Sequence, residues 1–383
     1  MSGEGRELKP ATLAARALGA VDPLTHGVTP PIQPATTFER APDYSLAGRH
    51  GYGRPDNPTF EPPEALLAAL EGGAAALLFS SGMAAATSVF QALAPGDHVL
   101  APRVMYWGLR NWLLGFARAW GLAVDLIDMT DLTAVAAGVQ PGRTRLIWIE
   151  TPANPTWSIT DIAGVAAIAH RAGARLAVDS TVATPVLTRP IEHGADLVMH
   201  SGTKYLNGHS DVIAGALVTA RTDELWQRIA DVRAHGGAVL GSFEAWLLLR
   251  GMRTLFLRVR ESCRGAQAIA ERLDGHAKLL AVLYPGLPAD PGHALARRQM
   301  AGGFGGMLSI RVRGGAPAAL RVAAGVKVWT RATSLGGVES LIEHRASIEG
   351  ANSPAPPDML RLSVGIEDVG DLIEDLEQAL APL

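Results

Sequence analysis

The chain has 383 residues, which is enough for two domains of ordinary size, each with its own core. Lysine plus arginine number 34 and aspartate plus glutamate 37, so the net charge of −3 gives no indication of a nucleic-acid or anionic membrane partner. The single cysteine, Cys263, excludes an intrachain disulfide framework and a cysteine-rich metal site. Residues 1–10 are polar and lack the apolar segment of a secretory signal, so we expect a cytoplasmic protein. The 11 histidines include no H-E-x-x-H pair, so we expect no bound metal.

The first half of the chain predicts an α/β domain preceded by an extended segment. Residues 29–63 are rich in proline and turn-forming residues and indicate an arm without regular structure. Beyond it, short apolar runs alternate with helical patterns, which is typical of a mostly parallel sheet covered by helices. Strands are expected at 74–79, 98–101, 123–127, 146–150, 176–179 and 197–200. Helices are expected near 83–93, 107–120 and 162–171.

The second half predicts a smaller α+β domain. Residues 243–273 carry apolar and basic residues at helical spacing without proline, which indicates one long helix or a kinked pair that joins two domains. Strand-like and helical pieces then alternate, with strands expected at 279–283, 307–312 and 359–364 and helices at 318–324 and 368–380. We therefore predict an N-terminal arm over residues 1–62, a large α/β domain over 63–245 and a C-terminal domain over 246–383.

Polar residues follow four of the expected strands. In an open parallel sheet, ligands bind beyond the carboxyl ends of the strands, so these residues are the first candidates for a site. They are Ser80-Ser81-Gly82-Met83, Thr151-Pro152-Ala153-Asn154-Pro155, Asp179-Ser180-Thr181 and Ser201-Gly202-Thr203-Lys204.

Lys204 is the most informative of these residues, because the chain has only four lysines. A lysine amine with a lowered pKa attacks carbonyl groups, which is the basis of pyridoxal phosphate chemistry. That cofactor also needs a carboxylate for its pyridinium nitrogen and a site for its phosphate. Asp179 could supply the first, and the helix start at Ser81-Gly82-Met83 could supply the second. Taken singly, a solvated lysine and a turn aspartate explain Lys204 and Asp179 about equally well, and a plain helix cap explains Ser81-Gly82-Met83 better.

In combination, these motifs resemble the Cys/Met-metabolism family of pyridoxal-phosphate enzymes, which contains cystathionine γ-synthases, cystathionine β- and γ-lyases and methionine γ-lyases. The resemblance extends from about residue 25 to the C-terminus, in the order of the family. The motifs that carry it are Tyr52-Gly53-Arg54, Ser81-Gly82-Met83, Asn154-Pro155, Val178-Asp179-Ser180-Thr181, His200-Ser201-Gly202-Thr203-Lys204-Tyr205, Ser334-Leu335-Gly336-Gly337 and Leu360-Arg361-Leu362-Ser363.

The resemblance implies the aspartate-aminotransferase-like fold, known as fold type I, and pyridoxal 5'-phosphate as cofactor. Lys204 would bind the cofactor covalently and move the substrate proton, and Asp179 would keep the pyridine nitrogen protonated. Tyr106 would stack on the cofactor ring and serve as an acid–base group. The residues implied in phosphate binding are Gly82, Met83, Ser201 and Thr203, with Tyr52 and Arg54 reaching the site of a neighbouring subunit.

The resemblance also implies a small amino-acid substrate and a homodimer that builds a homotetramer. Arg361 would bind the substrate α-carboxylate, aided by Asn154, and Ser334 would position Lys204.

Departures from the family pattern bear on the reaction. Thr333 and Gly51 stand where family members that act on cystathionine at Cγ commonly have glutamate, and Gly108 stands where methionine γ-lyases usually have cysteine. The run His344-Arg345-Ala346-Ser347 looks more like bacterial cystathionine β-lyases. We therefore expect carbon–sulfur elimination of the β-lyase type, yielding pyruvate, ammonia and a thiol. The alternative is γ-elimination or γ-replacement, as in γ-synthases, γ-lyases and methionine γ-lyases, possibly on an O-substituted homoserine or an unusual plant amino acid.

Other functional classes fit the sequence less well. The glycines of residues 302–306 lack the strand, spacing and acidic partner of a dinucleotide site. The run Gly208-His209-Ser210-Asp211-Val212 lacks the second glycine of a hydrolase nucleophile elbow. A non-catalytic descendant of the fold would be expected to lose Lys204, Asp179 or Arg361, and this chain keeps all three.

Overall fold

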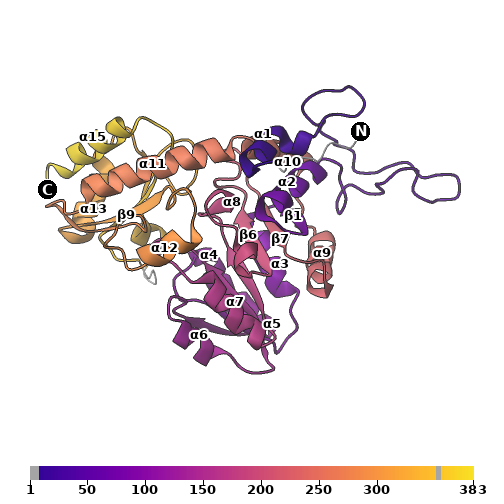
Figure 1. Cartoon of the computed structure of the whole chain (residues 1–383), viewed down its shortest axis with the longest axis horizontal. Coiled ribbons are helices and arrows are strands. Elements are labelled where there is room, and N and C mark those ends of the chain that lie inside the picture. Colours follow the sequence, from indigo (N-terminus) through magenta and orange to yellow (C-terminus); the bar gives the residue numbers. More distant parts are fainter. Residues whose placement is uncertain (1–7, 351–354) are drawn as a thin grey trace.

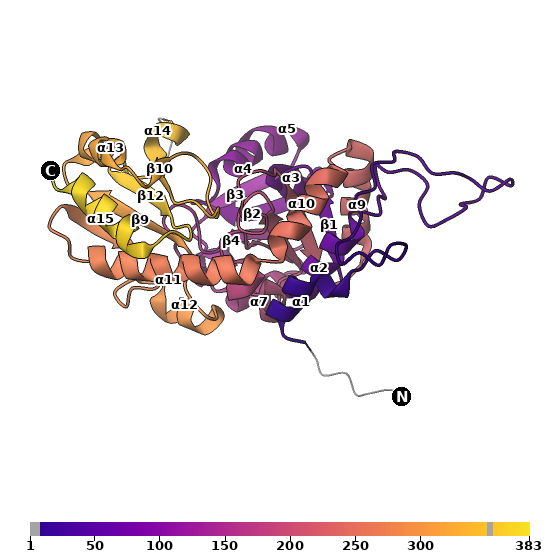
Figure 2. The ribbon, with the colours of Figure 1, turned by 90° about the horizontal axis from the view of Figure 1, so that it is seen from above.

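The computed structural model describes residues 8–350 and 355–383, so most of the polar N-terminal stretch 1–10 lies outside the described residues. Two β-sheets organise the chain, one of seven strands and one of five. Figures 1 and 2 show the C-terminal elements beside the larger sheet, with an N-terminal arm projecting from the opposite side. None of the described helices is long and apolar enough to cross a membrane.

The seven-stranded sheet has the order β1-β7-β6-β5-β4-β2-β3. Its strands are β1 (Ala75–Phe79), β2 (His98–Pro102), β3 (Ala123–Ile127), β4 (Thr144–Glu150), β5 (Arg175–Asp179), β6 (Leu197–Ser201) and β7 (Gly215–Thr219). Pairing is parallel from β3 through β2, β4 and β5 to β6, whereas β7 runs antiparallel to both β6 and β1. The mostly parallel sheet is thus confirmed, and β7 is a reversed strand that the sequence analysis missed.

Helices cover both faces of this sheet, and β4 shows how. Trp148 packs against Phe90 of α3 (Gly82–Gln91) on one face, with ring centroids 5.2 Å apart. The alternating residues Ile147 and Ile149 pack with Val165 of α7 on the other face. The helical segments in this half are α3 (Gly82–Gln91), α4 (Trp107–Trp112), η2 (Leu113–Ala117), α5 (Arg118–Trp120), α6 (Leu132–Gly138), α7 (Ile162–Arg171), α8 (Thr184–Leu187), η3 (Pro190–His193) and α9 (Glu224–Gly236).

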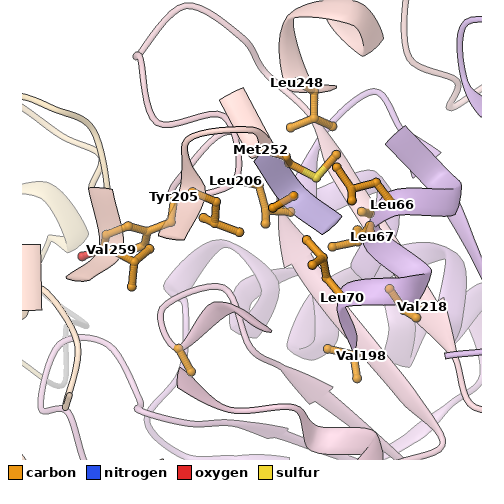
Figure 3. Packing of buried hydrophobic residues seen from close by; sticks show 14 of the residues in the cluster. Leu66, Leu67, Leu70, Val198, Tyr205, Leu206, Val218, Leu248, Met252 and Val259 are labelled. Atoms are coloured by element: carbon orange, nitrogen blue, oxygen red, sulfur yellow. The ribbon is translucent and has the colours of Figure 1, made fainter. Parts of the chain in front are cut away.

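The N-terminal elements are α1 (Pro10–Arg16), η1 (Ala17–Gly19) and α2 (Glu61–Glu71), with the irregular arm between η1 and α2. In Figures 1 and 2 this indigo arm extends away from the body of the molecule. Helix α2 itself is well anchored, because Leu66, Leu67 and Leu70 are fully buried. They pack in one cluster with Leu248 and Met252 of α10 (Ser242–Met252), as Figure 3 shows.

The expected helix over 243–273 is a kinked pair, α10 followed by α11 (Leu255–Leu273), with the break at residues 253–254. The domain boundary predicted at 245/246 falls inside α10. Arg258 near the start of α11 is buried, and it connects this junction to the loop between β6 and β7. Its guanidinium donates to the carbonyls of Tyr205 at 2.7 Å, Leu206 at 3.3 Å and Gly251 at 2.7 Å.

The C-terminal sheet has the order β10-β11-β12-β9-β8. Its strands are β8 (Leu279–Leu283), β9 (Met307–Val312), β10 (Thr330–Arg331), β11 (Leu341–His344) and β12 (Met359–Ser363), and its helices are α12 (His293–Gln299), α13 (Gly315–Gly325), α14 (Arg345–Glu349) and α15 (Val369–Leu380). This confirms the mixed α/β architecture with a smaller C-terminal unit. The short strands β10 and β11 were not expected from the sequence.

Asp375 of α15 holds the segment that leads into β10. Its carboxylate accepts the backbone N–H groups of Lys327, Val328 and Trp329 at 2.7 to 3.0 Å. Although burial opposes the effect, these bonds keep the pKa of Asp375 below its ordinary value.

We expect Asp375→Asn to destabilise the fold by about 1–3 kcal/mol, because an amide turns an N–H₂ group toward backbone donors. A thermal melt of the purified protein would show a lower melting temperature. Asp371→Asn, an exposed change in the same helix, is the matched control and should have little effect. Equal melting temperatures for the two variants would contradict the bracing role of Asp375.

Candidate active site

A cavity of about 260 Å³ lies at the carboxyl ends of the central strands. Eight of the residues to which the resemblance assigns a role line it: Gly82, Met83, Tyr106, Asn154, Asp179, Ser201, Thr203 and Lys204. They lie at the ends of β5 and β6, at the start of α3, and in the loops that follow β2, β4 and β6. This is where an open α/β sheet places a ligand.

Strand register brings the acidic groups of the cavity together. Glu150 at the end of β4 lies opposite Asp179 at the end of β5, and Asp179 lies opposite Met199 of β6. Ser201 then ends β6. Because parallel strands end at one edge, residues far apart in the chain meet without a long connecting loop.

Lys204 lies in the loop after β6, and its Nζ donates a hydrogen bond to Oγ of Ser334 at 2.8 Å. This bond joins the large sheet to the loop between β10 and β11. Burial and the positive charge of Arg361 lower the pKa of the Lys204 amine to about 8. A much larger fraction of the amine is therefore neutral and nucleophilic near neutral pH than for an ordinary lysine.

Asp179 presents a buried carboxyl to the same cavity. Oδ1 accepts the backbone N–H of Thr181 at 3.0 Å, and Thr181 itself receives the N–H of Ser201 at its hydroxyl. Burial raises the pKa of Asp179. Within the described residues Asp179 forms no salt bridge, so its chemistry suits a ligand that carries a positively charged N–H group.

Helix α3 begins at the cavity wall and offers its first backbone N–H groups there. Gly82 is required at this point, because a Cβ would lie 2.8 Å from the Cβ of Ser201. Ser81 caps the helix by accepting the N–H of Ala84 at 3.0 Å. The geometry therefore leaves a cradle for an anion between Gly82, Met83 and Ser201.

Thr203 lines the cavity, but its hydroxyl is already engaged with the backbone. Oγ1 donates to the carbonyl of Ala214 at 3.1 Å and accepts the N–H of Ala214 at 3.0 Å. Its part in phosphate binding stays a prediction, whereas its bonds brace the loop that carries Lys204.

Tyr106 is the residue directly before α4, and it is about two-fifths exposed. Gly108 makes room for the ring, because a Cβ there would lie 2.8 Å from Cε1 of Tyr106. The absence of a side chain at this position thus fits the placement of Tyr106.

Glu150 was not singled out from the sequence, although it ends an expected strand. Oε2 accepts the backbone N–H of Tyr106 at 2.7 Å, and Oε1 accepts that of Asn154 at 2.9 Å. Burial and the neighbouring Asp179 raise its pKa to about 8. One carboxyl therefore holds two segments of the cavity wall.

Arg361 of β12 lies beside the cavity without lining it, fully enclosed by the protein. It donates to the carbonyl of Ser334 at 2.7 Å, to Oδ1 of Asn154 at 3.3 Å and to Glu343 at 2.6 Å. The structure thus joins Lys204, Ser334, Arg361 and Asn154 in one hydrogen-bonded chain.

Tyr52 and Arg54 do not join this constellation. Tyr52 is half exposed on the arm, and Arg54 donates to the carbonyl of Ala234 at the end of α9. The single chain therefore does not bring the arm to its own cavity.

The comparisons with known proteins decide the family. The model of the Cys/Met metabolism PLP-dependent enzymes matches residues 11–381. The chain belongs to this family. It is 47% identical to the cystathionine γ-synthase of Mycobacterium tuberculosis, over 97% of this chain and 96% of that protein. It is 39% identical to the cystathionine β-lyase of Coxiella burnetii, over 94% of each.

Among solved structures, the cystathionine γ-synthase of Xanthomonas oryzae, in complex with aminoacrylate and cysteine, superposes with a TM-score of 0.94. It is 40% identical, and the match covers 98% of both chains. These matches confirm fold type I and pyridoxal phosphate as the cofactor. The cavity fits that group, since a buried carboxyl, an anion cradle bounded by Gly82 and a lysine of lowered pKa all face it.

The lowered pKa of Lys204 predicts how cofactor-free enzyme takes up pyridoxal phosphate. Only the neutral amine attacks the aldehyde, so the rate should rise with pH and level off above about 8 instead of above the ordinary 10.5. Stopped-flow absorbance at a series of pH values measures this rate. Pyridoxal without its phosphate is the control that separates amine from phosphate titration, and a midpoint near 10 would contradict the effect of burial.

The two bonds of Glu150 predict a defect in Glu150→Gln. Its amide has one oxygen for two backbone donors, so Tyr106 or Asn154 shifts, and kcat/KM should fall on the order of tenfold to a hundredfold. Cofactor content should stay near that of the wild type. Glu374→Gln, an exposed change, is the control, and kcat/KM equal to that of this control would show that Glu150 does not order the site.

Proposed function

We propose that this chain catalyses γ-replacement of the cystathionine γ-synthase type. The thiol of cysteine would displace the oxygen-linked group at Cγ of an O-substituted homoserine and yield cystathionine. The observation that carries the proposal is the 47% identity to the Mycobacterium tuberculosis γ-synthase over nearly both full lengths, against 39% to the Coxiella burnetii β-lyase. The comparisons therefore favour the alternative of the sequence analysis over its leading β-lyase prediction.

Proton transfer in this reaction falls to Lys204. Pyridoxal phosphate, when bound, provides an electron sink for the pair left at Cα. Lys204 Nζ takes the proton from Cα and, for departure at Cγ, also moves a proton at Cβ. Its lowered pKa and the bond to the Ser334 hydroxyl support both transfers, because the amine can be neutral and is held in one direction.

The remaining residues bind and orient. Asp179 would hold the pyridine nitrogen of the cofactor, and Gly82, Met83 and Ser201 would receive its phosphate at the start of α3. Tyr106 would cover the ring. These roles rest on the chemistry of the groups that face the cavity.

The substrate α-carboxylate would bind to Arg361 and Asn154. Nη1 of Arg361 is 3.3 Å from Oδ1 of Asn154, and Arg361 also bonds the carbonyl of Ser334, whose hydroxyl receives Lys204. A guanidinium with planar N–H donors suits a carboxylate. Binding there would direct the bond from Cα to its hydrogen toward Nζ.

We further propose a homodimer that builds a homotetramer in the cytoplasm, with Tyr52 and Arg54 reaching a neighbouring subunit's phosphate site. The arm supports this, because Leu24 is 88%, Val28 78% and Tyr44 83% exposed in the single chain. Such apolar exposure on an extended segment suits burial against a second copy.

Product analysis tests the reaction. With cofactor-loaded enzyme, O-acyl-L-homoserine and cysteine, we expect cystathionine as the main product. With L-cystathionine alone we expect little pyruvate. Release of pyruvate from cystathionine faster than cystathionine formation would overturn γ-replacement in favour of β-elimination.

Lys204→Ala should abolish turnover, whereas Lys327→Ala, at an exposed lysine, should retain it.

A further inference from the structure

A chain of four buried charges lies behind Arg361. Arg361 contacts Glu343, Glu343 contacts Arg345, and Arg345 contacts Glu349. Their side chains are only 2 to 4% exposed. Arg345 and Glu349 belong to α14, and the proposed chemistry uses neither of them.

The centre of this chain is a single carboxylate oxygen. Glu343 and Arg361 face each other across the β11–β12 pair, and Oε2 of Glu343 is 2.6 Å from Arg361. The same oxygen is 2.6 Å from Arg345. Although burial alone would raise it, Arg361, a hydrogen bond from Thr333 and Arg345 together hold the pKa of Glu343 below its ordinary value, so the carboxylate is charged.

This geometry poses a problem for binding a carboxylate at Arg361. A buried carboxylate next to Arg361 neutralises its charge and repels a second, incoming carboxylate. Arg345 offsets this effect, because it draws the same oxygen of Glu343 and adds a positive charge close by.

We propose that Arg345 is a positioning residue for substrate recognition: by sharing Glu343, it keeps Arg361 available for the α-carboxylate of the amino acid. This inference rests on the proposed function, in which Arg361 binds that carboxylate. It assigns opposite effects to two neighbouring groups. Loss of Arg345 weakens carboxylate binding, and loss of the Glu343 charge strengthens it.

The test compares two probes that bind the cofactor-loaded enzyme without turnover. Glycine has an amino and a carboxylate group, whereas methylamine has the amino group alone. The ratio of their dissociation constants, read from the visible absorbance of the bound cofactor, reports carboxylate recognition separately from the amine. Cofactor content and melting temperature are recorded for every variant.

Arg345→Gln combined with Glu349→Gln removes the shared cation with its outer partner. We expect the preference for glycine over methylamine to fall about tenfold, with methylamine affinity unchanged. Glu349→Gln alone is the matched control and should stay within about threefold of the wild type. Glu343→Gln should raise the preference for glycine over methylamine. A merely structural role of Glu343 would not produce an increase.

The outcomes separate this inference from the function beneath it. If Arg361→Gln leaves the preference unchanged, Arg361 does not bind the carboxylate, and that part of the proposed function fails. If Arg361→Gln abolishes the preference but the double variant keeps it, the role of Arg345 alone is refuted. If the double variant does not fold, Glu343→Gln decides the question. A lowered preference for glycine over methylamine in that variant would refute the role of Arg345.

Discussion

Parallel pairing of β4, β5 and β6 is the constraint on which the whole site depends. Their register places Glu150 beside Asp179, and Ser201 one strand further along. Side chains alternate between the faces of a strand, so a shift of one residue would turn Asp179 away from the cavity. The buried apolar residues on both faces of these strands oppose such a shift, and thus the packing of the core also specifies the chemistry.

Charges buried at the cavity must be compensated from elsewhere, because removing an ion from water is costly. The C-terminal sheet provides part of this compensation. Across the β11–β12 pair, Glu343 meets Arg361, and Arg361 in turn contacts the Ser334 carbonyl next to the hydroxyl that receives Lys204. The two sheets are therefore joined by polar contacts at the site, in addition to apolar packing around α10 and α11.

The sequence predicted the strands that carry the site because each is a short apolar run followed by turn residues. It did not predict β7 (Gly215–Thr219). Nor does anything in a five-residue apolar segment show that it runs antiparallel to its neighbours β1 and β6. Strand β11 was missed because it ends in the polar residues Glu343 and His344. Glu343 is buried there only through its ion pairs with Arg345 and Arg361. Glu150 was overlooked for a similar reason: its partners are backbone N–H groups, which leave no mark in the sequence.

The resemblance identified Lys204, Asp179 and Arg361, and the structure brings their segments together. It could not reveal how their charges are balanced. The pKa of Lys204 follows from burial and from Arg361, and both are properties of the folded chain. The contact between Arg345 and Glu343 is likewise a property of the folded chain, because it forms where α14 follows β11 directly.

Arg258 links mechanics to chemistry. Its guanidinium bonds the carbonyls of Tyr205 and Leu206, the two residues after Lys204, and it stands on α11, the helix that leads into the C-terminal sheet. It also bonds the carbonyl of Gly251 in α10, so a single side chain ties both helices of the break to the loop of Lys204. The position of Lys204 therefore depends on the same guanidinium that braces the junction between the two sheets.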